Sequence, residues 1–287
     1  MTILRHTDVI TTARRHLVRL AGCLLLLAVS MTAAAADWRS DAVDTLVRES
    51  GAHRLVVLGE MHGTREIPLL AGDLVERWSR TGPVLLALEI PAGEHAALRD
   101  VVTGGDTDAL IDDVRQRPWW RIAAADNDGR RSEDVLALIE RVGRLRRAGH
   151  DVAILPFDPR SRRCFELENC EAAMAHVIRR AHAALPRGRI VVVTGNVHAM
   201  RQRPINAPAV FPQMPMTALL RDLSPLSIDI AAKRGGFWAC VDEDACGPAP
   251  VTSPRDGGRQ PDDAPFDYRL VLPAFTPIRQ VGDAPEN

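Results

Sequence analysis

The sequence predicts an α/β protein with a mainly parallel sheet, helices on both faces, and a C-terminal antiparallel hairpin or edge strand. Short runs rich in Val, Leu and Ile lack polar alternation, which is typical of strands covered on both faces. These runs occupy residues 54–60, 83–91, 151–159 and 189–198. Amphipathic segments lie between them, at residues 66–80, 94–103, 132–148 and 170–185. This alternation of strand and helix indicates a parallel sheet.

The predicted helix at 132–148 carries signals at both ends. Ser132 precedes the first apolar residues of the helical pattern and is a good N-cap, because its hydroxyl can accept from a free N–H of the first turn. Gly149 follows the last residue of the pattern and predicts where the helix stops.

The pattern changes from residue 200 onward. A Pro-rich stretch at 201–216 predicts a loop, a candidate lid or pocket wall. Residues 226–241 resemble a hairpin that turns at Gly235-Gly236. Residues 266–273 predict a last strand at the edge of the sheet.

The N-terminus has the features of an export signal. A segment with four Arg precedes an apolar run and a tract of small residues at 34–36, so we expect residues 1–36 to be removed as a signal peptide. The apolar run is short for a membrane span, and no later stretch qualifies. Cys23 lies in a lipobox-like tract, but the apolar run follows Cys23 instead of ending there. A periplasmic or secreted protein is therefore favoured over a lipoprotein.

Residues 37–275 are long enough for a single α/β domain, and 276–287 predict a flexible tail. Removing the signal segment leaves 32 basic and 36 acidic residues, a net charge near −4. A chain with this charge balance lacks the excess of basic residues that binding to nucleic acid requires.

Four cysteines remain after the predicted cleavage, in two local pairs. An even number with short separations in an exported chain predicts two small disulfide loops, Cys164–Cys170 and Cys240–Cys246. A thiolate zinc site is disfavoured because its cysteine pairs usually lie closer together.

Ionisable side chains follow the predicted strands at the point where each strand ends. Gly59-Glu60-Met61-His62 closes the first strand, and Gly195-Asn196-Val197-His198 closes the fourth. The strands between them deliver Glu89 and Asp158. Ligands of open parallel sheets bind beyond the carboxyl ends of the strands, so we expect these side chains to share one cleft. Gly59 and Gly195 are expected to turn the chain there with unusual backbone angles.

This set of side chains permits two kinds of chemistry. Glu60, His62, Glu89 and His198 could bind a divalent Mn, Fe or Zn ion, which accepts mixed nitrogen and oxygen ligands. The same four residues could act without metal, with a carboxylate orienting a histidine that serves as general base toward water. Each residue alone also has a structural interpretation as a helix cap or a packed histidine.

Five further residues are candidate substrate contacts. Arg65 and Arg201 follow the two histidines and could hold a carboxylate or a developing oxyanion. Trp119 and Arg130 belong to a Trp- and Arg-rich loop that could form a pocket wall, although the tryptophans could equally fill the core. Asp158 precedes a proline and could instead belong to a turn.

The pattern Gly59-x-x-His62, Glu89, Gly195-Asn196-x-His198 resembles the superfamily of erythromycin esterases, ChaN-type haem-binding lipoproteins and TraB/PrgY/Tiki proteins. Residues 62–66, His-Gly-Thr-Arg-Glu, are similar to a tract of the esterase branch, whereas the Gly-x-x-His spacing is closer to the other branches. The resemblance covers residues 54–200 and implies an α/β core with a site at Glu60, His62, Glu89 and His198. It does not choose between the superfamily's activities.

Two functional hypotheses follow from the site and the resemblance. The first is a hydrolase that acts on an ester, lactone or amide of a small-molecule or peptide substrate. The second is a haem- or iron-binding protein that uses the same histidines as ligands. The only tyrosine is Tyr268 and no Cys-x-x-Cys-His motif is present, so the sequence favours the hydrolase.

Overall fold

The computed structural model describes residues 38–159, 170–209, 211–240, 245–252 and 256–282. The chain divides into two compact units, Met1–Ala42 and Val43–Asn287, and the second unit is the one described below. The predicted signal peptide, Cys23 and Cys164 lie outside the described residues.

The four apolar runs form adjacent parallel strands, as predicted. They lie in the order β3-β2-β4-β1 within a seven-stranded sheet. The strands are β1 (Leu55–Glu60), β2 (Val84–Pro91), β3 (Val152–Asp158) and β4 (Arg189–Gly195). All four carboxyl ends therefore point to one edge of the sheet.

The C-terminal part of the chain completes the sheet. β5 (Leu226–Ala232) lies parallel to β1, and β9 (Tyr268–Leu272) lies parallel to β5. The short β8 (Gly258–Arg259) pairs with β9 in the antiparallel sense and forms the edge. The strand predicted at 266–273 exists, but it lies one place in from the edge. The predicted fold class is confirmed.

The prediction of a hairpin that turns at Gly235-Gly236 is wrong. β5 belongs to the main sheet, whereas β6 (Gly236–Cys240) pairs with β7 (Cys246–Pro250) in a separate two-stranded sheet. Gly235 has φ +95°, and a Cβ there would lie 2.0 Å from the carbonyl oxygen of Phe275. This glycine is required for a close approach to residues 275–277, not for a hairpin turn.

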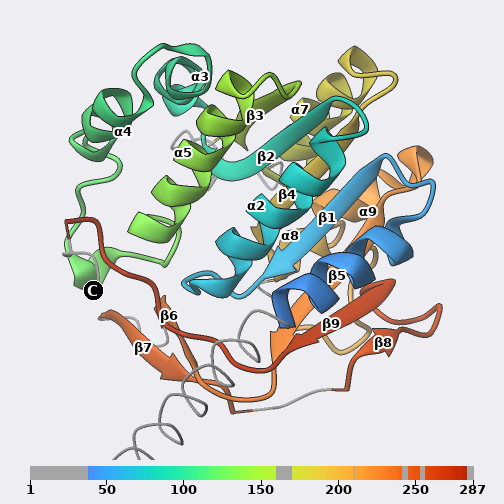
Figure 1. Ribbon diagram of the computed structural model, residues 1–287. Helices are drawn as coiled ribbons and strands as arrows, with labels where there is room; N and C mark the ends of the chain where they lie inside the picture. The colour runs from blue at the N-terminus through green and yellow to red at the C-terminus, as the bar shows by residue number, and fades with distance from the viewer. Residues whose placement is uncertain (1–37, 160–169, 210, 241–244, 253–255, 283–287) are drawn as a thin grey trace, which may run out of the picture. The chain divides into compact units, whose positions relative to one another are not determined.

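Helices cover both faces of the sheet. Figure 1 shows α2 (Glu66–Ser79) and α5 (Glu133–Arg147) in front of the strands, with α7 (Cys170–Ala184) and α9 (Met216–Leu219) behind them. The Ser132 hydroxyl accepts from the N–H of Val135, which confirms the predicted cap of α5. Residues 38–50 are also helical. Other helical segments are η1 (Ala92–Glu94), α3 (His95–Thr103), α4 (Thr107–Arg115), η2 (Ala124–Asp126), α8 (Asn196–Ala199) and η3 (Arg221–Leu223).

The core depends on the continuous apolar strands. Leu55 and Val57 of β1 pack with Met174 and Ile178 of α7 in one buried cluster. Successive side chains of a strand point to opposite faces, so Val56 and Leu58 face the other layer, and both are also fully buried. A strand buried on both faces is held rigidly, and the first residues beyond it are therefore well positioned.

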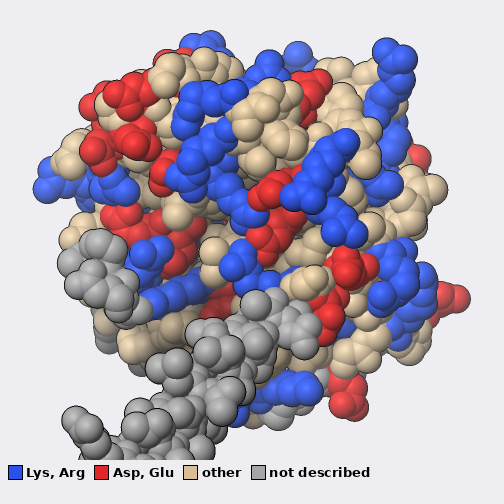
Figure 2. Space-filling model, in the orientation of Figure 1, with Lys and Arg blue, Asp and Glu red and all other residues tan. Residues whose placement is uncertain are grey.

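Charges are mixed on the face of the molecule shown in Figure 2, where basic and acidic side chains lie next to one another. Arg141 of α5 contacts Asp73 and Glu76 of α2 at 2.7 and 2.6 Å. Within the described ranges, no helix has both the length and the apolar character needed to cross a bilayer.

Residues 276–282, expected to belong to a flexible tail, instead make specific contacts. Ile278 is buried, and its N–H donates to the carbonyl of Gly63. The guanidinium of Arg279 lies 2.7 Å from Asp134 at the start of α5. This segment lies against two loops at the carboxyl edge of the sheet, so the ordered chain extends beyond residue 275.

The Cys240–Cys246 disulfide links β6 to β7 across a separation of six residues, as predicted. Cys164 lies outside the described residues, so its pairing with Cys170 stays a prediction. The hairpin holds two loops near the strand ends: Trp238 donates from its indole to the carbonyl of Asn127, and from its backbone to the carbonyl of Gly63.

Replacing Cys240 and Cys246 together by Ser is expected to lower the free energy of unfolding by about 2 kcal/mol, the chain-entropy value for so short a loop. Denaturant unfolding of the oxidised protein and of the double variant measures this difference. In the presence of a reductant the two proteins should become equally stable. An unchanged midpoint for the oxidised pair would contradict a stabilising disulfide.

Candidate functional site

Four strand ends bring the predicted ionisable residues together. Glu60 is the last residue of β1 and pairs in register with Gly195 of β4, so residues 60–62 and 195–198 leave the sheet side by side. Glu89 lies near the end of β2, between β3 and β4, and Asp158 is the last residue of β3. The crevice beyond the strands is where open α/β sheets bind ligands.

Glu89 lies at the centre of this group. Its side chain is only 3% exposed. One carboxylate oxygen, Oε2, accepts from the Thr194 hydroxyl at 2.7 Å and from the Gly195 N–H at 2.8 Å. The other, Oε1, accepts from Arg130 Nη1 at 2.9 Å. A buried carboxylate with three donors is held in one orientation.

Two carboxylate–imidazole pairs face Glu89, one near each of its carboxylate oxygens. His62 Nδ1 lies 2.8 Å from Glu60 Oε1, and His62 Nε2 lies 3.7 Å from Glu89 Oε2. His198 Nδ1 lies 2.6 Å from Glu171 Oε1, and His198 Nε2 lies 3.8 Å from Glu89 Oε1. Each outer carboxylate accepts from Nδ1–H, which leaves each Nε2 directed toward the centre of the site.

Glu171 was not among the residues predicted from the sequence. It lies in the first turn of α7, and its second oxygen accepts from the N–H of Met216 at 2.6 Å. The sequence signal was weak, because an acidic residue in the first turn of a helix is common for reasons of helix stability. The buried position of this carboxylate, 8% exposed, becomes visible only in the fold.

Glu89 and His198 stabilise one another's charged forms. Burial alone would raise the pKa of Glu89, but the charges of His62, His198 and Arg130 outweigh it and hold that pKa well below its usual value. Burial opposes protonation of His198, but the hydrogen bond to Glu171 and the charge of Glu89 raise its pKa above the usual value. The negative charge of Glu89 thus favours the protonated form of His198.

Arg130, predicted as a substrate contact, lies beneath the site and is 5% exposed. Its guanidinium contacts Glu89, Asp158 and Asp128. Burial would raise the pKa of Asp128, but its hydrogen bond to Arg130 and the charges of Arg130 and Arg131 lower that pKa to about 2. Arg130 therefore neutralises a cluster of carboxylates and fixes the position of Glu89, and Asp158 acts through Arg130.

The two strand-end glycines serve a different purpose from the one predicted. Neither Gly59 nor Gly195 has a positive φ. A Cβ on Gly195 would lie 2.9 Å from His62 Nε2, and one on Gly59 would lie 2.8 Å from the Cβ of Ala199. These glycines leave room for the histidine and for α8, respectively. The backbone freedom is used by Gly63, at φ +86°.

Three other residues predicted to contact substrate make their observed contacts with other parts of the protein. Arg65 Nε donates to the carbonyl of Pro277, and Arg201 Nη1 lies 2.6 Å from Asp267. Trp119 packs edge-on against the buried Trp120, with the guanidinium of Arg131 over its ring at 4.9 Å. Trp119 and Arg131 therefore pack outside the Asp128–Arg130 loop, where Arg131 contacts Asp128.

The donor set fits an added cation poorly. Among the described residues, no group of three or more His, Cys, Asp or Glu is arranged to hold a metal ion. The carboxylates of Glu60 and Glu171 each bond to an imidazole Nδ1, so they are not free as direct ligands, and only the two Nε2 atoms and Glu89 are left to face an ion. The positive charge of Arg130 already lies 2.9 Å from Glu89, where a further cation would be repelled.

Comparisons with known proteins give a likeness of fold. No family model and no curated protein matches this chain. Among solved structures, the erythromycin esterase EreC in an open conformation is similar at a TM-score of 0.60 and 12% identity, covering 83% of this chain and 95% of its own. A protein from Bacillus cereus is similar at a TM-score of 0.53 and 11% identity, covering 84% and 93% of the two chains.

A succinoglycan biosynthesis protein is similar at a TM-score of 0.51 and 12% identity, with 82% of this chain and 91% of its own covered. These likenesses extend over most of each chain. Identities this low show the fold and no specific activity. The chain has an erythromycin-esterase-like α/β fold.

Proposed function

We propose that this protein hydrolyses an ester, lactone or amide bond with water activated by His62. The observation that supports the proposal is the pair of carboxylate–imidazole groups whose Nε2 atoms face a single buried carboxylate. Two histidines with different partners can divide the work of a base and an acid.

In this mechanism His62 is the general base. The Nδ1–H donates to Glu60, so Nε2 carries the lone pair. Nε2 takes a proton from water while the water oxygen attacks the carbonyl carbon, and a tetrahedral intermediate forms. Glu60 orients the ring, and the negative charge of Glu89 stabilises the imidazolium as it forms.

His198 is the general acid. Its raised pKa favours the protonated ring, with one N–H directed to Glu171 and the other toward Glu89. When the intermediate collapses, the bond between carbon and leaving group breaks, and the leaving atom takes the proton from Nε2. The net reaction adds one water across the bond, and the two rings exchange protons with solvent before the next turnover.

We also propose that the reaction takes place outside the cytoplasm. The disulfide between Cys240 and Cys246 is consistent with an oxidising compartment. An N-terminal segment typical of exported proteins supports the same location.

A panel of simple esters, lactones and amides tests the proposed activity. We expect hydrolysis of at least one class, and we expect the rate to be unchanged after chelation with EDTA, since His62 and not an ion activates the water. Loss of activity on chelation, with recovery on adding Mn, Fe or Zn ions, would contradict the metal-free mechanism. No hydrolysis, together with a Soret shift on adding haemin that is lost in His62→Ala, would favour the haem-binding alternative.

Replacing Glu171 by Gln is expected to move the basic limb of the pH profile to lower pH. The general acid must be protonated, so the rate falls as the pH rises through the pKa of His198. Glu171 raises that pKa, and removing its charge lowers it. The measurement is kcat/KM against pH. Glu140→Gln, which removes a carboxylate paired with Arg144 on α5, is the control and should leave the profile unchanged. An unshifted limb in Glu171→Gln would contradict the role of His198.

A further inference from the structure

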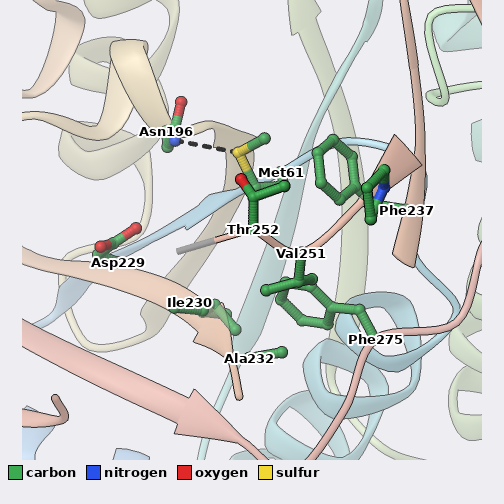
Figure 3. A pocket seen from close by; sticks show the side chains of 11 residues that line it. Met61, Asn196, Asp229, Ile230, Ala232, Phe237, Val251, Thr252 and Phe275 are labelled. Atoms are coloured by element: carbon green, nitrogen blue, oxygen red, sulfur yellow. Dashed lines mark hydrogen bonds between the residues drawn. The ribbon is translucent and has the colours of Figure 1, made fainter. Parts of the chain in front are cut away.

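A mostly apolar cavity of about 200 Å³ lies at the carboxyl end of β5, and its lining includes Met61 and Asn196. Figure 3 shows Ile230, Ala232 and Phe275 at one end of it, and Phe237 and Val251 along its side. These side chains come from β5, β6 and the segments that follow β7 and β9. All lining residues belong to the described part of the chain.

The cavity adjoins the proposed catalytic residues through two neighbours in sequence. Met61 lies between Glu60 and His62, and Asn196 follows Gly195. The Asn196 amide lies 3.4 Å from the Met61 sulfur, and this pair closes one end of the cavity in Figure 3. Because β5 pairs directly with β1, a group inside the cavity lies one strand away from the His62 loop.

The size and the lining select a class of ligand. An apolar cavity of about 150 Å³ is large enough for benzene, whereas pockets for whole drug-sized molecules exceed about 300 Å³. A cavity of about 200 Å³ therefore has room for a phenyl-sized group but not for a whole drug-sized molecule. Two aromatic rings, Phe237 and Phe275, line it and can pack against such a group.

We propose that this cavity binds a phenyl-sized apolar substituent of the substrate and sets the substrate preference of the site. The inference deepens the proposed hydrolase and rests on it. It identifies the substrate as an ester or amide with one compact apolar group close to the scissile bond, on the acyl or on the leaving side.

Binding is tested without catalysis by titrating the protein with benzyl alcohol and following the methyl NMR signals of Ile230 and Val251. We expect saturable shifts in the wild-type protein. Val251→Phe fills the cavity and should abolish the shift at Ile230. Phe211→Ala, a change at a half-buried ring that packs against the core cluster and not in the cavity, should leave it intact. No saturable shift in the wild-type protein would overturn the proposal.

Substrate preference is tested with methyl acetate, methyl phenylacetate, benzyl acetate and methyl naphthylacetate. The wild-type protein should favour one of the two phenyl esters by about tenfold or more in kcat/KM, since filling an apolar pocket gives preferences of this size. Methyl phenylacetate and benzyl acetate distinguish the acyl side from the leaving side. Val251→Phe should remove the preference, and Phe237→Ala should shift it toward the naphthyl ester.

The outcomes separate the two proposals. If the wild-type protein and both variants hydrolyse the esters with the same ratios of kcat/KM, the cavity is not a substrate site. The proposed hydrolase activity would remain supported. Saturable binding of benzyl alcohol without hydrolysis of any ester would overturn the hydrolase and support the cavity as a ligand site.

Discussion

Replacing Glu89 by Gln is expected to lower kcat for hydrolysis by about 10³-fold, because removing one preorganised electrostatic group from a buried site has an effect of this size. The variant keeps the shape of the side chain but loses the negative charge that both imidazoles face. Steady-state kinetics on the best ester of the panel measures the effect.

The same substitution is expected to lower the free energy of unfolding by about 3 kcal/mol, since breaking a buried ion pair leaves a charge without its partner. Arg130 keeps Asp128 and Asp158, so the loss should fall at the lower end of the range for such pairs. Denaturant unfolding at neutral pH gives this value.

The loss of stability should depend on pH in a defined direction. The pKa of Glu89 in the folded protein lies below its usual value of 4.5. Its contribution is therefore present above about pH 4.5 and is lost as the pH falls through the folded-state pKa. The difference in stability between the wild-type protein and Glu89→Gln should narrow in acid. A constant difference from pH 7 to pH 3 would contradict an ionised Glu89.

Glu94→Gln is the matched control for this prediction. Glu94 is a buried glutamate that pairs with Arg117 at 2.6 Å, just beyond the same strand. Replacing Glu94 should lower the free energy of unfolding and leave kcat for hydrolysis unchanged. Equal losses of activity in the two variants would show that Glu89 acts only through the fold.

The carboxyl edge of the sheet could be predicted because its strands are apolar on both faces. A continuous run such as Val56–Leu58 identifies a buried strand, and the polar residues that come just after the run lie near the strand end. Four such runs placed Glu60, Glu89, Asp158 and His198 at one edge without any knowledge of side-chain geometry. The structure brings these residues into the group described above.

Contacts between elements distant in sequence could not be predicted in this way. Glu171 reaches His198 only because α7 packs behind β4, and Arg130 turns inward because it is surrounded by three carboxylates. Gly235-Gly236 was misjudged for the same reason. Gly235 allows a close approach to Phe275, which lies far along the chain. Local turn signals do not distinguish that role from a hairpin.

Substituting His62 by Asn is the other change with a large expected effect, a decrease in kcat of about 10³-fold, within the range for loss of a general base. His62 is half-buried, and Asn can still bond to Glu60, so the fold should be retained. His150→Asn is the control, since His150 is also half-buried and contacts the Ser79 hydroxyl at 3.0 Å away from the site. It should leave kcat unchanged.

In the proposed mechanism Glu60 affects catalysis only through His62, and a double variant tests this directly. Glu60 is 2.8 Å from His62 Nδ1 and contributes by orienting that ring. Glu60→Gln alone should therefore lower kcat, whereas Glu60→Gln added to His62→Asn should lower it no further, because residues that act as a unit are not additive. A further decrease in the double variant would show that Glu60 acts on the substrate or the water independently of His62, and the assignment of the base would then move to Glu60 itself.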